Sequence, residues 1–387
     1  MDVSIVGYGM TAVGEHWSRG IGELAEEAGQ LALEDAGLGQ VDALYIGNAY
    51  GGTFNGQTQL GSLIANQLNL DGIEAYTCEA GDASGGVALR TGYLAVASGA
   101  VKTALVLGVE KATDMVGPAR VASRGVSLDA DFESVNGATL AAMAGLLMRR
   151  YMYEYGLELS HFEGFSINAH RNGARNPQAM YRNRLRAGAF AKAPMIAAPV
   201  SLFDSAPDAD GAAAVVLAAT DVAADLVPRP VAILGSATAT DSLTLQDRHN
   251  PLQLRAVKTS TDRALEQAGL SLSDIHVLEL HDAFTVLTAL SLEAMGVSQA
   301  GEGWQWARDG GLGIALDGDL PISTFGGLKS RGNPSGATGV YQAAEAALQL
   351  RGEAGDNQVR GAKQALAQNI GGLGATAVTH ILSVSPE

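Results

Sequence analysis

Asp82 stands just before a predicted helix, in the segment EAGDASGGVALRTGYLAVASG that covers residues 79–99. The small residues around it are typical of a turn, and the residues that follow have the pattern of an amphipathic helix. Backbone N–H groups at a helix N-terminus attract negative charge, so such a turn is a common place to build a site. A carboxylate there can move a proton, attack an activated carbonyl, or cap the helix.

Three other segments place polar side chains among small residues. They are HDAF at 281–284, GNPSGATG at 332–339 and NIGGLGA at 369–375. Glycine-rich turns let a backbone approach a ligand closely, and His, Asp and Asn supply hydrogen-bond donors and acceptors. These segments can form one site with Asp82 only if the helices and strands around them bring them together in the fold.

Composition narrows the classes of function. The chain has 387 residues, of which 47% are hydrophobic, and a formal net charge of −16, which argues against a nucleic-acid-binding surface. A single cysteine, Cys78, allows no intramolecular disulfide and no zinc cluster built from thiolates, and suits a cytoplasmic location. The spacing of the histidines predicts no metal site. We expect no signal peptide and no membrane span.

An internal repeat sets the expected architecture. Residues 31–51 and 263–284 align without a gap, so that ALEDAGL at 32–38 faces ALEQAGL at 264–270. Each copy has the pattern of a helix, a glycine stop, a short loop and an apolar strand. The similarity extends upstream, where 3–14 resembles 231–241.

Downstream of the repeat, two further pairs of segments resemble each other. Residues 84–99 and 335–352 both read as small-residue turns that open long helices, and the apolar strands at 103–110 and 375–384 follow them. We expect two similar α/β halves, at 1–229 and 230–387. An insertion at about 112–200, rich in Arg, Met and Tyr, is expected to form a lid over a substrate or an oligomer surface.

These motifs, in this order, resemble the thiolase superfamily. The resemblance covers the whole chain and is closest to the branch that holds the sterol-carrier-protein (lipid-transfer) and archaeal-type thiolases. It implies an α/β thiolase fold of two duplicated βαβαβαββ halves, with mixed five-stranded sheets in an α-β-α-β-α layering. It also implies an acyl-CoA substrate, coenzyme A only as part of that substrate, no permanently bound cofactor, and a homodimer or a dimer of dimers.

The sequence departs from the family at its catalytic positions. The resemblance places a nucleophilic cysteine at the head of the turn DASG, where this chain has Asp82, while Cys78 lies four residues earlier in a predicted strand. The histidine of a GHP motif is replaced by Asn333, which cannot act as a base near neutral pH. The second cysteine is missing from both HDAF and NIGG. Only His281 matches, at a position that helps to polarise a thioester oxygen.

Three functions stay open. The first is carbon–carbon bond formation or cleavage on an acyl-CoA without a covalent cysteine intermediate, as in an aldolase or lyase. The second is a catalytically silent acyl-CoA-binding or scaffold subunit in which Asp82 caps the helix. The third is a conventional acetyl-CoA C-acyltransferase. A small OB-fold, zinc-ribbon protein that carries part of the CoA site is a possible partner implied by the resemblance.

Several residues are therefore candidates for the site. The catalytic candidates are Asp82, His281 and Asn333. The candidates for binding substrate or CoA are Ser335, Gly336, Asn369, Gly371 and Gly372. The arginines that either meet CoA phosphates or form a solvated face are Arg171, Arg175, Arg182 and Arg184.

Overall fold

Nine strands form one mixed sheet in the computed structural model, which describes residues 1–186 and 188–384. The strands are β1 (Val3–Met10), β2 (Ala43–Gly47), β3 (Glu74–Cys78), β4 (Thr103–Glu110), β7 (Gly211–Ala219), β8 (Val231–Thr240), β9 (Val277–Glu279), β10 (Gln364–Gly371) and β11 (Thr376–Val384). Their order across the sheet is β3-β2-β4-β7-β1-β8-β11-β10-β9. Most of the strands are buried along their length, as their runs of Ala, Val, Leu and Ile predict.

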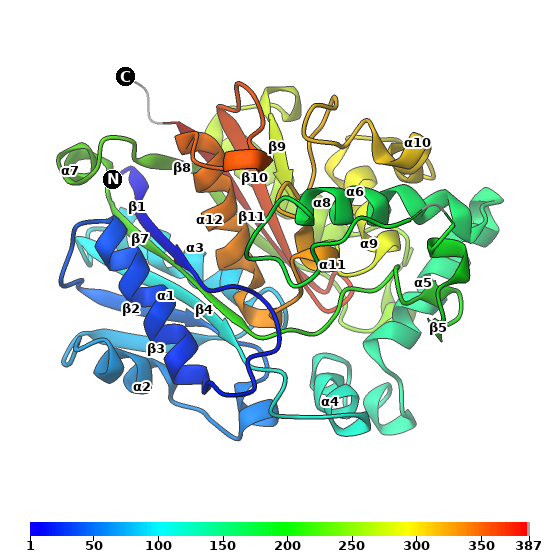
Figure 1. Ribbon diagram of the computed structural model, residues 1–387, viewed down its shortest axis with the longest axis horizontal. Coiled ribbons are helices and arrows are strands. Elements are labelled where there is room, and N and C mark those ends of the chain that lie inside the picture. The colour runs from blue at the N-terminus through cyan, green and yellow to red at the C-terminus, as the bar shows by residue number, and fades with distance from the viewer. Residues whose placement is uncertain (187, 385–387) are drawn as a thin grey trace.

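The sheet consists of two similar parts that meet at β1 and β8 (Figure 1). Only the pairs Ser4–Ala232 and Ile5–Val231 join these two antiparallel strands. In the first part, β2 is parallel to β3 and β4, and β7 is antiparallel to β4 and β1. The second part repeats this arrangement with β9 parallel to β10, and β11 antiparallel to β10 and β8. The second part has no full strand equivalent to β3 among the described residues. A single parallel bridge between Leu278 of β9 and Ile322 takes its place.

The strand order corrects one of the sequence alignments. Strand β4 lies between β2 and β7, and the strand in the equivalent place of the second half is β10, which lies between β9 and β11. The match of 103–110 with 375–384, which form β4 and β11, is therefore wrong, and β11 corresponds to β7. Strands β10 and β11 are both apolar and form one antiparallel hairpin, so composition alone could not tell them apart.

Helices lie outside the two parts of the sheet and between them (Figure 1). The helices are α1 (Ile21–Asp35), α2 (Leu60–Gln67), α3 (Ser84–Ala97), α4 (Pro118–Ser123), α5 (Leu140–Tyr155), α6 (Glu163–Gly173), α7 (Thr220–Leu226), α8 (Arg255–Ala268), α9 (Thr285–Met295), α10 (Arg308–Gly311), α11 (Gly327–Ser330) and α12 (Thr338–Arg351). Helices α1 and α2 cover the first part, α8 covers the second, and α3 and α12 pack against each other in the middle layer. This is the expected thiolase layering. None of the helices in the described residues is both long and apolar enough to cross a membrane.

The two middle helices approach each other closely at their N-termini. A Cβ atom on Gly85, at the head of α3, would lie 2.7 Å from the carbonyl oxygen of Gly336, just before α12. A Cβ on Gly339 would collide with the backbone of Gly86. The small residues of both turns are therefore needed to bring the two helix heads into contact.

The insertion forms α4, α5, α6 and a short hairpin of β5 (Met195–Ala197) with β6 (Val200–Ser201). Helices α5 and α6 pack against α9, and α6 also contacts α10 and α11, so much of the insertion rests on the second half of the chain. Helix α4 lies apart from them, beside the short π-helix Gly51–Asn55 (Figure 1). The division of the halves at 229/230 stays a prediction.

Candidate active site

The head of α3 is fixed by Ser84 and not by Asp82. The Ser84 hydroxyl donates to the carbonyl oxygen of Gly81 at 2.5 Å, and its oxygen accepts from the N–H of Ala80 at 2.9 Å. The N-cap residue is Ala83, and no side chain caps the helix. The capping role considered for Asp82 is therefore wrong, because its carboxylate faces another partner.

That partner is Arg124, which immediately follows α4 in the insertion. Its Nη2 lies 3.0 Å from Oδ2 and 3.3 Å from Oδ1 of Asp82, and its Nη1 binds Asp208. Burial alone lowers the pKa of Arg124, but the negative charges of Asp208 and Asp82 outweigh it and raise this pKa well above its usual value. Asp82 is 3% exposed, so the site holds a charged pair largely shielded from water.

The only cysteine of the chain lies away from this point. Cys78 is the last residue of β3, and its Sγ lies 3.7 Å from the hydroxyl oxygen of Thr91 on α3. Thr91 is seven residues after Ser84, so the thiol packs beside the helix roughly 10 Å along its axis from the head. Burial raises the pKa of Cys78, which makes it a poor nucleophile.

His281 follows β9 and is held in one tautomer by Asn369. The Asn369 Oδ1 accepts from the N–H of Gly86 on α3 at 3.1 Å, which turns its Nδ2 towards Nδ1 of His281 at 3.2 Å. Nδ1 then accepts a hydrogen bond, so the neutral ring carries its proton on Nε2. Burial lowers the pKa of His281 to about 4, although Asp82 opposes this shift. The Nε2 atom is buried and has no partner in the described part of the chain.

Asn333 is oriented in a similar way. Its Oδ1 accepts from the hydroxyl of Thr338, the first residue of α12, at 3.1 Å. Its backbone N–H donates to Pro207 and its carbonyl accepts from Ala209, so it is tied to the segment that carries Asp208. This leaves the Nδ2 hydrogens of Asn333 for a ligand in the cavity that the residue lines.

A cavity of about 920 Å³ lies between the insertion, the segment at 202–208 and the second half of the chain. Asp82, Arg124, Asp208, Asn333 and Gly372 line its polar part. Aliphatic and aromatic side chains from 121–141, 185–203 and 283–284 form an apolar wall, and further polar side chains, among them His170 and Lys329, also line the cavity. A cavity with an apolar wall and a few convergent polar groups is typical of a small-molecule site.

The other predicted binding residues lie close to the site but not on the cavity wall. Gly336 donates its N–H to Glu110 at 3.0 Å, and Ser335 is buried beside it. Gly371 allows close approach to the backbone of Ala80, since a Cβ there would collide with its carbonyl oxygen. Among the predicted binding residues, Gly372 lines the cavity directly, whereas Asn369 acts on His281.

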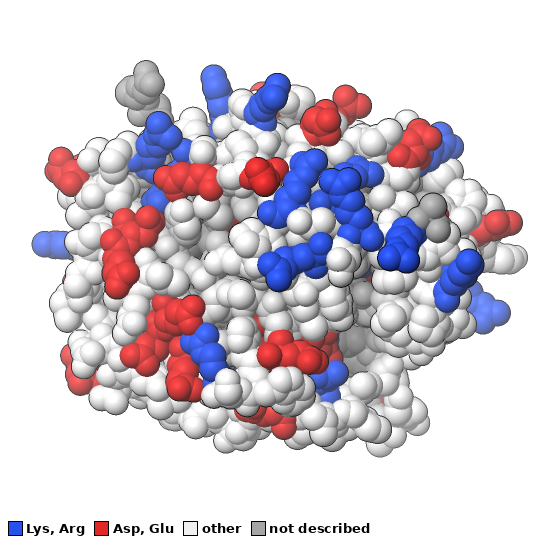
Figure 2. Space-filling model, in the orientation of Figure 1, with Lys and Arg blue, Asp and Glu red and all other residues white. Residues whose placement is uncertain are grey.

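The four predicted arginines have different surroundings. Arg171 donates to the backbone carbonyl of Gly310 at 2.7 Å, and Arg184 lines the cavity with Arg186. Arg175 and Arg182 are exposed nearby. Lys and Arg side chains gather on one face over the segment that follows α6 (Figure 2).

Sequence reasoning missed several charged residues of the site. Arg124 and Asp208 come from segments that had no recognisable pattern. Glu110 ends β4, and its carboxylate accepts from the N–H groups of Ala49, Tyr50 and Gly336 at 3.0 to 3.1 Å. Burial raises the pKa of Glu110 to about 7 despite these hydrogen bonds. A carboxylate at the end of an apolar strand was the signal that could have identified it. The described residues contain no cluster of three or more His, Cys, Asp or Glu placed to hold a metal ion.

Comparison with known proteins assigns the chain to one family. The model of the thiolase N-terminal domain matches residues 3–221, and the model described as thiolase C-terminal domain-like matches 237–384. The chain belongs to the thiolase family. It is 39% identical over 384 residues to an acetyl-CoA acetyltransferase of Methanothermobacter thermautotrophicus, covering 99% of both chains. It is 31% identical over 394 residues to sterol carrier protein 2 of Homo sapiens, covering 97% of this chain and 71% of the relative.

Solved structures confirm the fold. The structure described as "Ltp2-ChsH2(DUF35) aldolase" superposes with a TM-score of 0.86 at 24% identity, covering 99% of this chain and 98% of the other. A monomeric SCP2-thiolase like protein type 1 from Mycobacterium smegmatis gives a TM-score of 0.75 at 19% identity, covering 100% and 77%. The family models and the sterol carrier protein 2 relative, together with this fold, confirm the resemblance to the sterol-carrier-protein and archaeal-type branch.

Proposed function

We propose that this protein binds acyl-CoA thioesters and makes or breaks a carbon–carbon bond without a covalent cysteine intermediate. The observation that carries the proposal is the pair of Asp82 with Arg124 at the head of α3, where the family resemblance expects a thiol. Cys78, the only thiol, is bound to Thr91 instead.

Two donors would stabilise a negatively charged thioester oxygen. Asn333 lines the cavity and presents its Nδ2 hydrogens, whereas His281 is buried two residues before Ala283 of the cavity wall and has an Nε2–H without a partner among the described residues. Their hydrogen bonds to Asn369 and Thr338 fix both groups before a ligand binds. Donors that are oriented in advance stabilise an enolate oxygen more than mobile ones do. His281 lies close enough to Asp82 and Arg124 for their charges to affect its pKa.

The reaction that fits these groups best is cleavage of a 3-hydroxyacyl-CoA. Asp82 takes the proton of the 3-hydroxyl, the bond between Cα and Cβ breaks, and Cβ becomes the carbonyl carbon of the released product. The electron pair forms an enolate whose oxygen accepts hydrogen bonds from His281 and Asn333. The proton then passes to Cα, which gives a shorter acyl-CoA. The similarity of fold to a structure described as an aldolase supports this choice.

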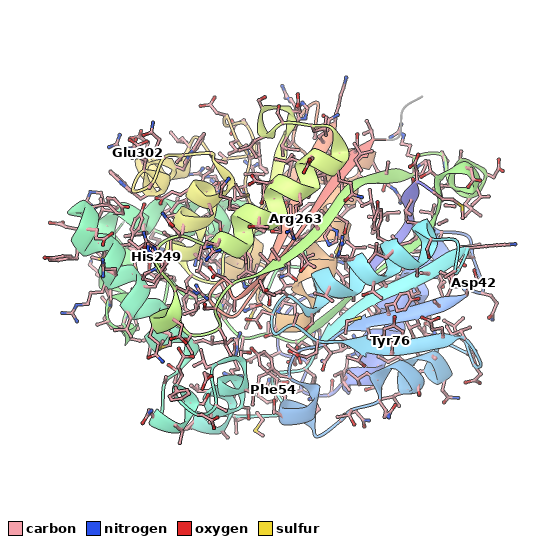
Figure 3. All side chains as sticks on the ribbon, turned by 180° about the vertical axis from the view of Figure 1, so that it is seen from behind. Asp42, Phe54, Tyr76, His249, Arg263 and Glu302 are labelled. Carbon is pink, nitrogen blue, oxygen red and sulfur yellow. The ribbon has the colours of Figure 1, made fainter. Side chains whose placement is uncertain are left out.

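Binding of the CoA moiety and of partners forms part of the proposal. Arg184 and Arg186 on the cavity wall are placed to meet phosphate groups. The name "Ltp2-ChsH2(DUF35)" joins two components, which supports a small OB-fold, zinc-ribbon partner for this chain. A homodimer would cover β3, an edge strand of the sheet on which Tyr76 is 45% exposed (Figure 3).

Incubation with matched 3-hydroxyacyl-CoA and 3-ketoacyl-CoA thioesters tests the proposal. We expect cleavage of at least one 3-hydroxyacyl-CoA to an aldehyde or ketone and a shorter acyl-CoA, and its loss in Asp82→Asn. The absence of turnover, with the candidate partner present or absent, would overturn the lyase proposal. The double variant Asp82→Cys with Asn333→His tests whether the natural residues prevent thiolysis. Thiolysis that appears only in this variant would show that the natural protein is not a thiolase.

Two alternatives have specific support. The ion pair with Arg124 occupies both oxygens of Asp82, which favours a silent acyl-CoA-binding subunit. Tight acyl-CoA binding without turnover, together with a cysteine-containing paralogue in the same complex, would favour that function. The name of the Methanothermobacter relative favours a conventional acetyl-CoA C-acyltransferase, which thiolysis by the unmodified chain would demonstrate.

A further inference from the structure

The cavity contains a second polar pair, which the proposed reaction does not use. Lys329 on α11 is 2% exposed and His170 on α6 is 7% exposed, yet both lie on the cavity wall. They come from the second half and the insertion, respectively. Two aromatic rings flank the imidazole of His170, with the ring centroids of Tyr181 and Phe203 at 6.2 and 5.9 Å from its own.

The Lys329 ammonium has hydrogens available for a ligand. Its Nζ donates to the backbone carbonyl of Asp204, which uses one of three hydrogens. Within the described ranges, no carboxylate lies within ion-pair distance of this Nζ. Burial lowers the pKa of Lys329 to about 8, against the opposing effect of the Asp282 and Asp204 charges. A buried ammonium gains free energy from each further acceptor that it finds.

His170 supplies the complementary group. Its Nδ1 lies 3.2 Å from the backbone carbonyl oxygen of Asn183, so Nδ1 carries the proton and donates it. Burial lowers the pKa of His170, and the nearby Lys329 charge lowers it further, so the ring is neutral at pH 7. The Nε2 atom of a neutral ring in this tautomer is an acceptor.

The pair lies within reach of an acyl group bound at Asp82. Lys329 binds Asp204, and four residues further along the same segment Asp208 binds Arg124, the partner of Asp82. Four residues of extended chain span at most about 14 Å. Ser205, Ala206, Pro207 and Asp208 all line the cavity, so this segment forms a continuous wall between the two polar groups.

We propose that Lys329 and His170 form a subsite for a neutral oxygen, a hydroxyl or a ketone, on the acyl group of the acyl-CoA. This inference rests on the proposed acyl-CoA binding and specifies its substrate class. A ketone accepts from Lys329, whereas a hydroxyl accepts from Lys329 and donates to His170. A carboxylate fits less well, because Asp204 and Asp282 already place negative charge around the ammonium. An entirely aliphatic chain would offer no acceptor to the remaining hydrogens of Lys329 and no donor to Nε2 of His170.

Calorimetric titration with a panel of octanoyl-CoA derivatives tests the subsite. Each member carries one hydroxyl or one oxo group at a different carbon, and unsubstituted octanoyl-CoA is the reference. We expect the wild type to bind at least one oxygenated member on the order of 10-fold more tightly than octanoyl-CoA, as for a hydrogen bond to a charged group. Lys329→Met should abolish this preference. His170→Phe should abolish a preference for a hydroxyl and leave a preference for a ketone.

Lys258→Met is the matched control, because Lys258 pairs with Asp262 on the exposed face of α8 and should leave every affinity unchanged. Equal binding of all members by the wild type would overturn the subsite even if the Lys329 variant failed to fold. A preference that survives in Lys329→Met would overturn it as well. Failure of octanoyl-CoA and every derivative to bind would instead contradict the proposed function itself.

Discussion

Arg124 and Asp82 form an ion pair, with 3.0 Å between Nη2 and Oδ2, that joins the insertion to the head of α3. Arg124 also binds Asp208, so one guanidinium connects three segments that are distant in the sequence. Its carbon Cζ lies 5.4 Å from the ring centroid of Tyr50. The insertion is thus anchored at the position where the family resemblance expects the nucleophile.

Removal of this guanidinium is expected to destabilise the protein. Arg124→Gln leaves the buried Asp82 without a positive partner and leaves Asp208 with Arg120 alone, which should lower the free energy of unfolding by about 3 kcal/mol. Arg150→Gln removes an exposed pair with Glu154 and should cost less than about 0.5 kcal/mol. Denaturant unfolding followed by circular dichroism measures both. Equal effects of the two substitutions would contradict a structural role for the buried pair.

Asn369 is expected to act as a positioning residue for His281. Asn369→Asp replaces the amide donor by an acceptor, so the imidazole must place its proton on Nδ1, and the pKa of His281 should rise from about 4. Turnover should fall on the order of 100-fold, the usual effect of losing one oxyanion donor, while acyl-CoA binding persists. NMR titration of His281 and the pH profile of turnover measure these effects. Gln364→Glu, at the start of β10, is the control. An unchanged histidine pKa in Asn369→Asp would refute the assignment of the tautomer.

Glu110 predicts a pH dependence of stability. The folded protein keeps the proton of this carboxyl up to a pKa of about 7, whereas the unfolded chain releases it near 4.5. Stability from this group is therefore fully present below pH 4.5 and is lost as the pH rises to about 7. Glu110→Gln cannot titrate, so its free energy of unfolding should fall less over this interval than that of the wild type. If the free energy of unfolding falls equally with pH in the two proteins, Glu110 does not contribute to the pH dependence of stability.

The thiol of Cys78 is expected to react slowly in the folded protein. Burial raises its pKa, and its Sγ contacts the Thr91 hydroxyl. A disulfide reagent should therefore modify it more slowly in the folded than in the denatured protein, because burial lowers both the thiolate fraction at a given pH and the access of the reagent. Spectrophotometric measurement of the reaction provides the rates. Rapid modification of the native thiol, as in an activated catalytic cysteine, is the contrary result.

Local sequence predicted the parts of the site that short motifs carry. The turn at Asp82 opens α3, and the turn before Thr338 opens α12, because small residues followed by an amphipathic pattern specify a helix and its N-terminus. The repeat at 32–38 and 264–270 correctly predicted α1 and α8. The family resemblance named His281 and Asn369 as separate candidates, and their mutual hydrogen bond emerged only in the structure.

Long-range contacts were not predictable in this way. Arg124 reaches Asp82 from an insertion with no repeat partner, and nothing in its local pattern distinguishes it from the other arginines there. Lys329 looks like a surface residue of a short helix, but α11 is buried against α6. The incorrect match of β4 with β11 has a related cause. Pairing in a sheet depends on strand order, which apolar composition does not specify.

The proposed reaction handles acyl groups without a bond to sulfur. Intact-mass spectrometry of protein quenched after mixing with a 3-ketoacyl-CoA tests this most directly, in the wild type, in Cys78→Ala and in Asp82→Cys. We expect no acyl adduct on the wild type or on Cys78→Ala, whereas Asp82→Cys is the variant able to retain one. An acyl mass on the wild type that disappears in Cys78→Ala would contradict the proposed reaction.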